Sequence, residues 1–188
     1  MKHLKYTLIL LAVISISCLG DKNKSNINEL VNEKATTNTV IKTSKIDIDK
    51  IKEKLCYEFP NELILGYNPD ANYIEIEPVD NGSGGILHCN VKLFYGEKDY
   101  EYWHGQVFAN INEMKDPFWQ YNPERNATLY QKVDGLGEKA VYISNMYQLL
   151  ILKEGVIYSI VPPNRGSNTN SGKQTKAIAL EIAKHYGL

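Results

Sequence analysis

Hydrophobic and polar positions divide the chain into three parts with different patterns. Residues 7–16 carry no charge and are mostly apolar, and they follow a short basic start that contains Lys2 and Lys5. Residues 20–44 are rich in Asn, Lys, Thr and Ser and hold few large apolar side chains. From residue 45 onward, apolar positions recur with the periods of helices and strands. We therefore expect a signal peptide at 1–17, a flexible tether at 18–44 and a single globular domain at 45–188.

The two ends of the expected domain have helical periodicity. Ile48, Ile51 and Leu55 are three and four residues apart, which places them on one helical face. Residues 174–185 repeat this spacing near the end of the chain, where a following glycine is a typical helix stop. The pattern thus predicts an N-terminal and a C-terminal helix, with a further helical turn at residues 62–66.

Between these helices the pattern indicates strands. Alternating or continuous apolar runs cover residues 73–79, 86–95, 101–111, 141–144, 148–153 and 156–161. Glu154-Gly155 separates the last two runs and suits a tight hairpin turn. We expect an α+β domain built on an antiparallel sheet of about five to six strands.

The apolar leader is too short to cross a bilayer, which needs about twenty residues. It ends in Ser15-Ile16-Ser17-Cys18, which resembles the lipobox of bacterial lipoproteins, although an aliphatic residue is usual where Ser15 stands. In that family the cysteine is acylated and becomes the new N-terminus, so the resemblance implies a membrane anchor at Cys18. Acyl chains on this residue would hold the protein firmly at a membrane. Leu19, in place of an acidic residue, resembles the sorting pattern of lipoproteins sent to the outer membrane.

Composition and charge further narrow the class of protein and the kinds of partner that can be expected. Hydrophobic residues make up 43% and charged residues 23% of the chain, which is typical of globular and not of disordered proteins. The formal net charge is −1, so there is no electrostatic case for nucleic-acid binding. Tyrosine is abundant, with 13 residues, and it suits both strand faces and binding surfaces.

Two cysteines remain once Cys18 is assigned to the lipid. In an oxidising compartment Cys56 and Cys89 are most simply a disulfide, and the alternative is two free buried thiols.

The mature part resembles small exported lipoproteins of unknown function, in which an early helical cysteine pairs with a cysteine on a strand. Matching features are Cys89-Asn90-Val91, the stretch 133–138 (Val-Asp-Gly-Leu-Gly-Glu) and the apolar hairpin at 149–161. That resemblance implies an α+β fold and no activity.

Three candidate chemistries lie in the domain. The segment 166–174 is similar to a phosphate-binding loop, but its glycines are one residue too far apart and Gln174 replaces the required Ser or Thr. His88, Cys89 and His104 could be metal ligands, yet adjacent strand residues point to opposite faces and no fourth ligand is evident. Glu75 and Glu77 could act as paired carboxylates, but they alternate with apolar residues as on any solvated sheet face. We predict no catalytic residue, metal or cofactor.

The aromatic segment 116–126 is the best candidate for contact with a partner. It contains Phe118, Trp119 and Tyr121 between Pro117 and Pro123. Aromatic side chains in a restrained loop are typical of binding surfaces. The alternative is that these rings pack into the core.

These observations favour a cell-envelope lipoprotein whose domain is a non-catalytic binding or accessory module for a protein or a small ligand. Two alternatives stay open. One is an exported hydrolase with scattered site residues, and the other is a protective lipoprotein that blocks a toxin. A deep pocket with convergent polar groups would favour an enzyme or the binding of a small ligand, whereas a flat aromatic patch would favour a protein partner.

Overall fold

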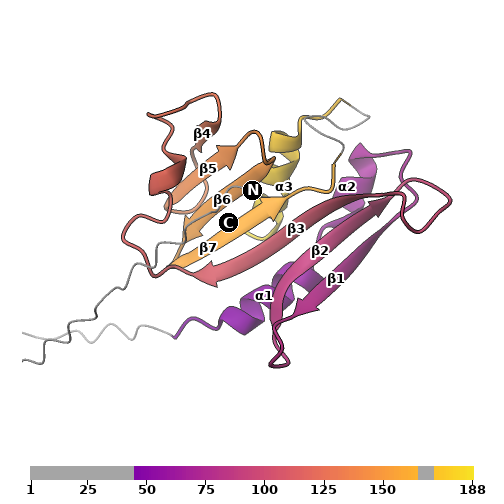
Figure 1. Cartoon of the computed structure of the whole chain (residues 1–188), viewed down its shortest axis with the longest axis horizontal. Helices are drawn as coiled ribbons and strands as arrows, with labels where there is room; N and C mark the ends of the chain where they lie inside the picture. Colours follow the sequence, from indigo (N-terminus) through magenta and orange to yellow (C-terminus); the bar gives the residue numbers. More distant parts are fainter. Residues whose placement is uncertain (1–44, 165–171) are drawn as a thin grey trace, which may run out of the picture. The chain divides into compact units, whose positions relative to one another are not determined.

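A seven-stranded antiparallel sheet forms the centre of the domain (Figure 1). The structure is a computed structural model and describes residues 45–164 and 172–188. In spatial order the strands are β1-β2-β3-β7-β6-β5-β4. Their bounds are β1 Tyr73–Asp80, β2 Ile86–Phe94, β3 Tyr102–Ile111, β4 Tyr130–Val133, β5 Lys139–Ile143, β6 Gln148–Lys153 and β7 Val156–Val161. The predicted α+β class and antiparallel sheet are confirmed, but the sheet has one strand more than expected.

The additional strand is β4, which forms one edge of the sheet. It has only four residues, Tyr130–Val133, and all four pair with β5. So short a segment contains too few positions to establish an alternating pattern, and its strand conformation depends on the partner strand.

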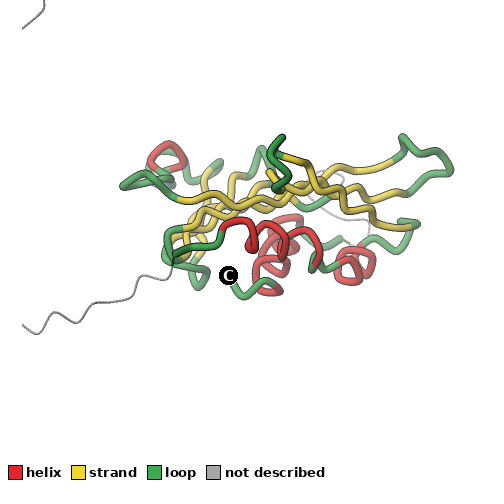
Figure 2. The backbone as a smooth tube through the Cα atoms, turned by 90° about the horizontal axis from the view of Figure 1, so that it is seen from below, coloured by secondary structure: helices red, strands yellow, loops and turns green. Residues whose placement is uncertain are grey.

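Three α-helices pack on one face of the sheet, as Figure 2 shows from below. Their bounds are α1 Ile48–Tyr57, α2 Asn61–Tyr67 and α3 Thr175–His185. Asp47 begins α1 by accepting a hydrogen bond from the Lys50 backbone N–H at 3.2 Å, which satisfies an otherwise unpaired amide. Gly187 follows α3 with φ of 74°, as expected of a residue that ends a helix. None of the described helices has the length and apolar character that crossing a membrane requires.

The strand register explains why one face is buried. Neighbouring strands align Cys89 with Val107, Val107 with Ile160, and Ile160 with Leu149. All four side chains are at most 1% exposed and form a continuous row beneath the helices. Because side chains alternate along a strand, their sequence neighbours face the opposite side, which the α-helices leave uncovered.

Two local features fix the connections around β7. Glu154 and Gly155 both adopt positive φ, 50° and 76°, which makes the predicted tight turn between β6 and β7. At the other end of β7, a side chain at Gly105 would lie 2.5 Å from the Pro163 nitrogen. Glycine is therefore needed on β3 where the chain leaves β7.

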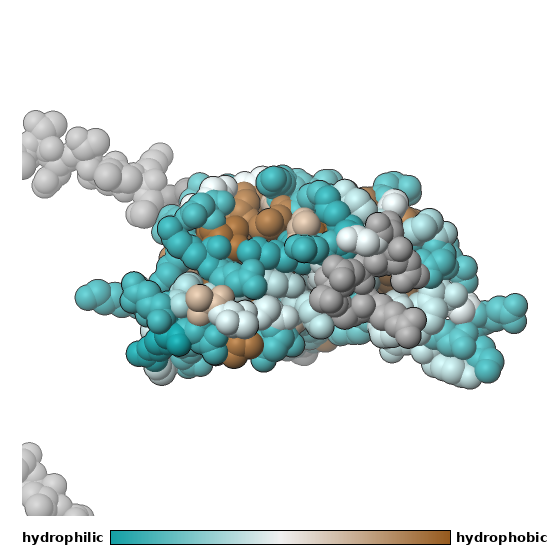
Figure 3. Space-filling model, turned by 90° about the horizontal axis from the view of Figure 1, so that it is seen from above, coloured by the Kyte–Doolittle hydropathy of each residue, from teal (hydrophilic) through white to brown (hydrophobic). Residues whose placement is uncertain are grey.

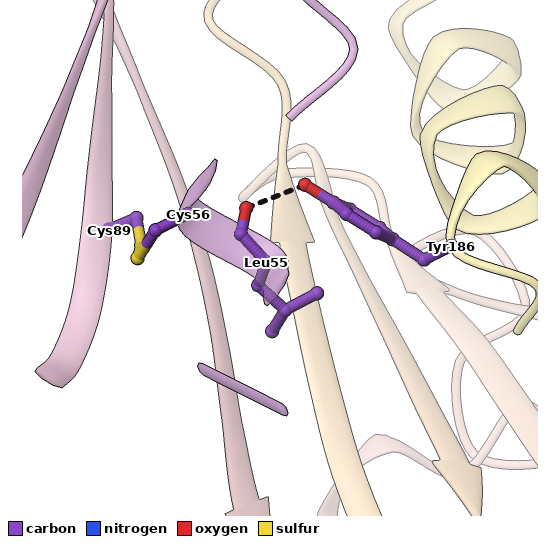
Figure 4. Close-up of a disulfide and its surroundings, with 4 residues drawn as sticks. All are labelled: Leu55, Cys56, Cys89 and Tyr186. Carbon is purple, nitrogen blue, oxygen red and sulfur yellow. Dashed lines mark hydrogen bonds between the residues drawn. A yellow bond between two sulfur atoms is a disulfide. The ribbon is translucent and has the colours of Figure 1, made fainter. Parts of the chain in front are cut away.

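A disulfide joins the helical layer to the sheet. Cys56 of α1 and Cys89 of β2 are bonded, their Cα atoms lie 5.6 Å apart, and both side chains are buried (Figure 4). The two cysteines predicted to pair are thus paired.

Candidate functional site

The aromatic segment singled out in the sequence lies on the opposite face of the sheet from the α-helices. It contains the 3-10 turn η1 (Trp119–Tyr121), drawn as the short helix above the sheet in Figure 2. Asn and Asp side chains fix its backbone at four places. Each accepts a hydrogen bond of 2.9 to 3.1 Å from a backbone N–H two or three residues further on; the acceptors are Asn112, Asp116, Asn122 and Asn126. Such local bonds give a loop a defined shape without a strand partner.

Phe118 anchors this loop to the sheet. Its side chain is 1% exposed and packs against Val141, Ile143 and Leu150 in a second, smaller core. The ammonium group of Lys139 lies 5.7 Å from the centre of its ring and also pairs with Asp116 at 2.8 Å. Phe118 was expected at a contact surface, but its burial makes it a packing residue of the loop.

Trp119 and Tyr121 are more accessible to solvent than Phe118. The Trp119 side chain is 52% exposed although it is the next residue in the chain. Tyr121 is half-buried, and its ring meets that of Tyr130 edge to face with centroids 5.7 Å apart. One predicted residue thus holds the loop in place, and the other two leave aromatic surface accessible beside it.

A cavity of about 320 Å³ opens between this loop and the connection from β4 to β5. Tyr121 and Pro123 form part of its wall on the loop side, and residues 132–141 form the other part. This size is at the lower end of what small-molecule sites usually have. The structure thus brings together the aromatic loop and the stretch 133–138, two segments that the sequence singled out separately.

The stretch 133–138 has a structural explanation. Leu136 is buried in the main core, and Gly137 adopts a φ of 51° with no space for a side chain beside the Leu152 carbonyl. The Glu138 carboxylate accepts a hydrogen bond of 2.7 Å from the Glu154 backbone N–H in the β6–β7 turn. These residues position a turn and tie it to the neighbouring hairpin.

Two pairs of opposite charges lie near the loop. The hydrogen bond from Lys139 holds the pKa of the Asp116 carboxyl below its usual value. Lys132 and Asp134 pair at 2.7 Å on the cavity rim, with both side chains largely exposed. Neither pair includes Trp119 or Tyr121, whose rings are the aromatic surface that remains accessible beside the cavity.

A larger hollow, of about 580 Å³, lies along α1. Its walls include Ile51 and Tyr57 from the helix, and Val156 and Tyr158 from β7. Burial raises the pKa of the Tyr158 hydroxyl, and the nearby Glu154 adds to this shift. Its lining includes both lysines and acids, among them Lys50 and Glu53, so its charge does not favour one class of ligand.

The other candidate residues occupy ordinary structural positions. Cys89 is bonded to Cys56 and cannot be a metal ligand, while the His104 imidazole contacts the Asn90 amide oxygen at 3.2 Å. Glu75 and Glu77 both pair with Lys92, at 3.3 and 3.1 Å. Within residues 45–164 and 172–188, no group of three or more His, Cys, Asp or Glu side chains could hold a metal ion.

Two further predictions fall outside the described residues. The acylation of Cys18, with the leader and the tether, lies in residues 1–44, and most of the phosphate-loop-like segment lies in residues 165–171. Lys173, at the described end of that segment, pairs with Glu181 at 2.7 Å and lies 4.8 Å from the centre of the Tyr67 ring. Lys173 therefore links α2 and α3.

Comparison with known proteins gives no relative. No protein-family model, curated protein or solved structure matches the chain. The candidate site is therefore defined by its geometry alone.

Proposed function

We propose that this protein is a cell-envelope lipoprotein, anchored through an acylated Cys18, whose domain is a non-catalytic binding or accessory module. The observation that carries the binding role is the exposure of Trp119 on a loop held by the buried Phe118. A loop that already has a defined shape loses little entropy when a partner docks. Tryptophans with this character are frequent among the residues that dominate binding energy.

A protein partner suits this surface better than a small ligand. The adjacent cavity is small, and Trp119 stands half-exposed outside the set of residues that line it. Met114, whose backbone N–H donates a hydrogen bond to the Asn112 side chain, is also half-exposed on the same loop. Exposed apolar side chains on a restrained loop are typical of protein contact sites.

The binding role is tested by comparing two aromatic substitutions. The full chain, isolated with its own envelope, is chemically cross-linked to its neighbours, and the cross-linked species are quantified for the wild type, Trp119→Ala and Tyr57→Ala. Tyr57 is more exposed than Trp119, at 73%, and lies on α1, so it is a matched control for loss of an exposed ring. We expect Trp119→Ala to remove a specific cross-linked species that Tyr57→Ala retains. Equal retention in both variants would rule out the Trp119 surface.

The anchor is tested separately. Cys18→Ser removes the acylated thiol and should move the protein from the membrane fraction to the soluble fraction after cell disruption. Mass spectrometry of the wild-type N-terminal peptide should show acyl chains on Cys18. A Cys18→Ser variant that remains acylated and sediments with membranes would contradict the anchor.

A further inference from the structure

The end of the sheet farthest from Trp119 along β3 carries a second group of aromatic side chains. Strand β1 begins there, β2 ends and β3 begins, and the β2–β3 hairpin extends beyond the sheet at the right of Figure 1. Three exposed tyrosines, Tyr73, Tyr95 and Tyr100, and the half-buried Tyr102 gather at this end. We call these four residues the tyrosine tip.

Ring stacking holds most of the tip in place. Tyr73 stacks on the buried Phe94 with ring centroids 4.5 Å apart, and the Tyr102 ring is tilted against Phe94 with centroids 5.2 Å apart. On the opposite face of the sheet, Tyr95 stacks on Trp103 at 5.2 Å. Rings fixed in this way present surface at low entropic cost, as tyrosine-rich binding loops do.

The hairpin that carries Tyr100 is acidic. Residues 96–101 contain Glu97, Asp99 and Glu101 and a single basic residue, Lys98. Glu97 and Asp99 are exposed to solvent, and neither makes an ion pair with another residue of the part of the chain that the structure describes. Figure 3 shows a hydrophilic surface at the right-hand end of the molecule, where this hairpin lies.

Lys98 indicates what the tip can accept. Its ammonium group lies 5.4 Å from the centre of the Tyr100 ring, and the Tyr100 side chain is 70% exposed. A cation at this distance from an aromatic face is attracted by the ring. The intramolecular contact shows that the Tyr100 ring can accept a cation, and the acidic residues of the same hairpin would add attraction for a lysine or arginine of another molecule.

We propose that the tyrosine tip is a docking surface for a Lys- or Arg-rich segment of a partner protein. The partner's cations would lie over the exposed faces of Tyr100 and Tyr73, with Glu97 and Asp99 supplying opposite charge. Lys98 already lies over the Tyr100 ring and would compete with the partner's cation for this position. Electrostatic complementarity of this kind speeds association and selects the partner by charge.

This surface is separate from the Trp119 loop. The ten residues of β3 begin at the tip and end just before that loop, and a strand of ten residues spans about 30 Å. A domain with two such surfaces could hold two partners at the same time. The tip can be tested whether or not the Trp119 proposal is correct.

The test uses the full chain in detergent and a synthetic octalysine peptide as the probe. The dissociation constant is measured by titration calorimetry for the wild type, Tyr100→Ser, Lys98→Ala and Lys50→Ala. Lys50 is an exposed lysine near the start of α1, so its replacement changes the net charge by the same amount away from the tip.

Substitutions at Tyr100 and Lys98 should change the affinity for octalysine in opposite directions. Tyr100→Ser should weaken binding about three- to fivefold, as expected for loss of one exposed cation–ring contact. Lys98→Ala should strengthen binding about threefold, because the competing cation is gone, whereas Lys50→Ala should change it much less. Binding should also weaken as salt is raised.

Three results would overturn the proposal. The first is no measurable binding of octalysine at low salt. The second is an equal gain from Lys98→Ala and Lys50→Ala, which would show attraction to the overall charge only. The third is spermine binding as tightly as octalysine with the same dependence on Tyr100, which would make the ligand a small polyamine and not a protein segment.

Discussion

The hydroxyl group of Tyr186 donates a hydrogen bond of 2.7 Å to the backbone carbonyl of Leu55 (Figure 4). Tyr186 directly follows α3, and Leu55 lies in the last turn of α1, 131 positions earlier in the chain. The carbonyls of a helix's last turn have no partner within the helix, so Tyr186 satisfies one that is buried. Burial also raises the pKa of the Tyr186 hydroxyl, which therefore stays protonated as the donor.

Replacement of this tyrosine should destabilise the domain without changing its shape. Tyr186→Phe keeps the ring and removes the bond, which leaves the Leu55 carbonyl unpaired. We expect the free energy of unfolding to fall by about 1 to 2 kcal/mol. Denaturant titration followed by circular dichroism measures the change. Tyr57→Phe, at an exposed ring, is the control and should leave the stability unchanged.

The disulfide should make a larger contribution. Cys56 and Cys89 are 33 positions apart, and closing a loop of this length restricts the unfolded chain by roughly 3 to 4 kcal/mol. Reduction of the wild-type protein should lower the denaturation midpoint accordingly. A variant with both cysteines changed to Ala should already have the lower midpoint and should not respond to reductant. A wild-type midpoint without reductant equal to that of the double-Ala variant would show that the bond does not stabilise the fold.

Most of the sheet could be predicted from the sequence, because burial of a strand requires apolar residues at regular positions along it. Strands β6 and β7 have the predicted bounds, since most of their residues are apolar and the Glu154-Gly155 turn separates them. The helices at the two ends followed from apolar spacing and from Gly187. The short β4 was not predicted, because its conformation depends on pairing with β5 and not on a pattern of its own.

The candidate site was less predictable than the fold. Phe118 and Trp119 are adjacent aromatic residues in the sequence, and only the packing against Val141 and Leu150 determines which of the two is buried. The tyrosine tip depends on the register that brings Tyr73, Phe94 and Tyr102 side by side from three strands. Sequence distance hides such a group, although the frequency of tyrosine in the chain indicated that one could exist.

An ion pair beside the contact between the second and third helices should make stability depend on pH. Glu181 accepts hydrogen bonds from Lys173 and from the Tyr67 hydroxyl, each at 2.7 Å. The bond from Lys173 is the main reason why the pKa of Glu181 lies below its ordinary value of 4.5. A carboxyl with a lowered pKa in the folded state stabilises the fold above its unfolded pKa, and this contribution is lost as pH falls through the folded pKa.

We therefore expect acid to weaken the contact between α2 and α3 below about pH 4.5. The free energy of unfolding is compared at pH 7 and pH 3 for the wild type and for Glu181→Gln. The variant should be less stable at pH 7 and should lose less stability on acidification than the wild type. An identical loss in both proteins would show that Glu181 does not contribute to the acid response.

Truncation of Phe118 should cost much more stability than truncation of Trp119. Phe118→Ala empties a fully buried site beneath the loop and should lower the free energy of unfolding by about 3 to 5 kcal/mol. Trp119→Ala removes a half-exposed ring and should lower it by less than about 1 kcal/mol. Denaturant titration of both variants measures the difference, and a large loss in Trp119→Ala would assign that ring to the core.

Tryptophan fluorescence gives an independent measure of the exposure of Trp119. In a Trp103→Phe background, Trp119 is the sole tryptophan of the chain, and acrylamide should quench its emission readily because the side chain is 52% exposed. Adding Phe118→Ala should increase the quenching further, since the loop loses its attachment to Val141, Ile143 and Leu150. Quenching that stays low with Phe118 in place would mean that Trp119 is covered in the free protein. The loop could then not present the ring to a partner, and the proposed binding surface would have to be abandoned.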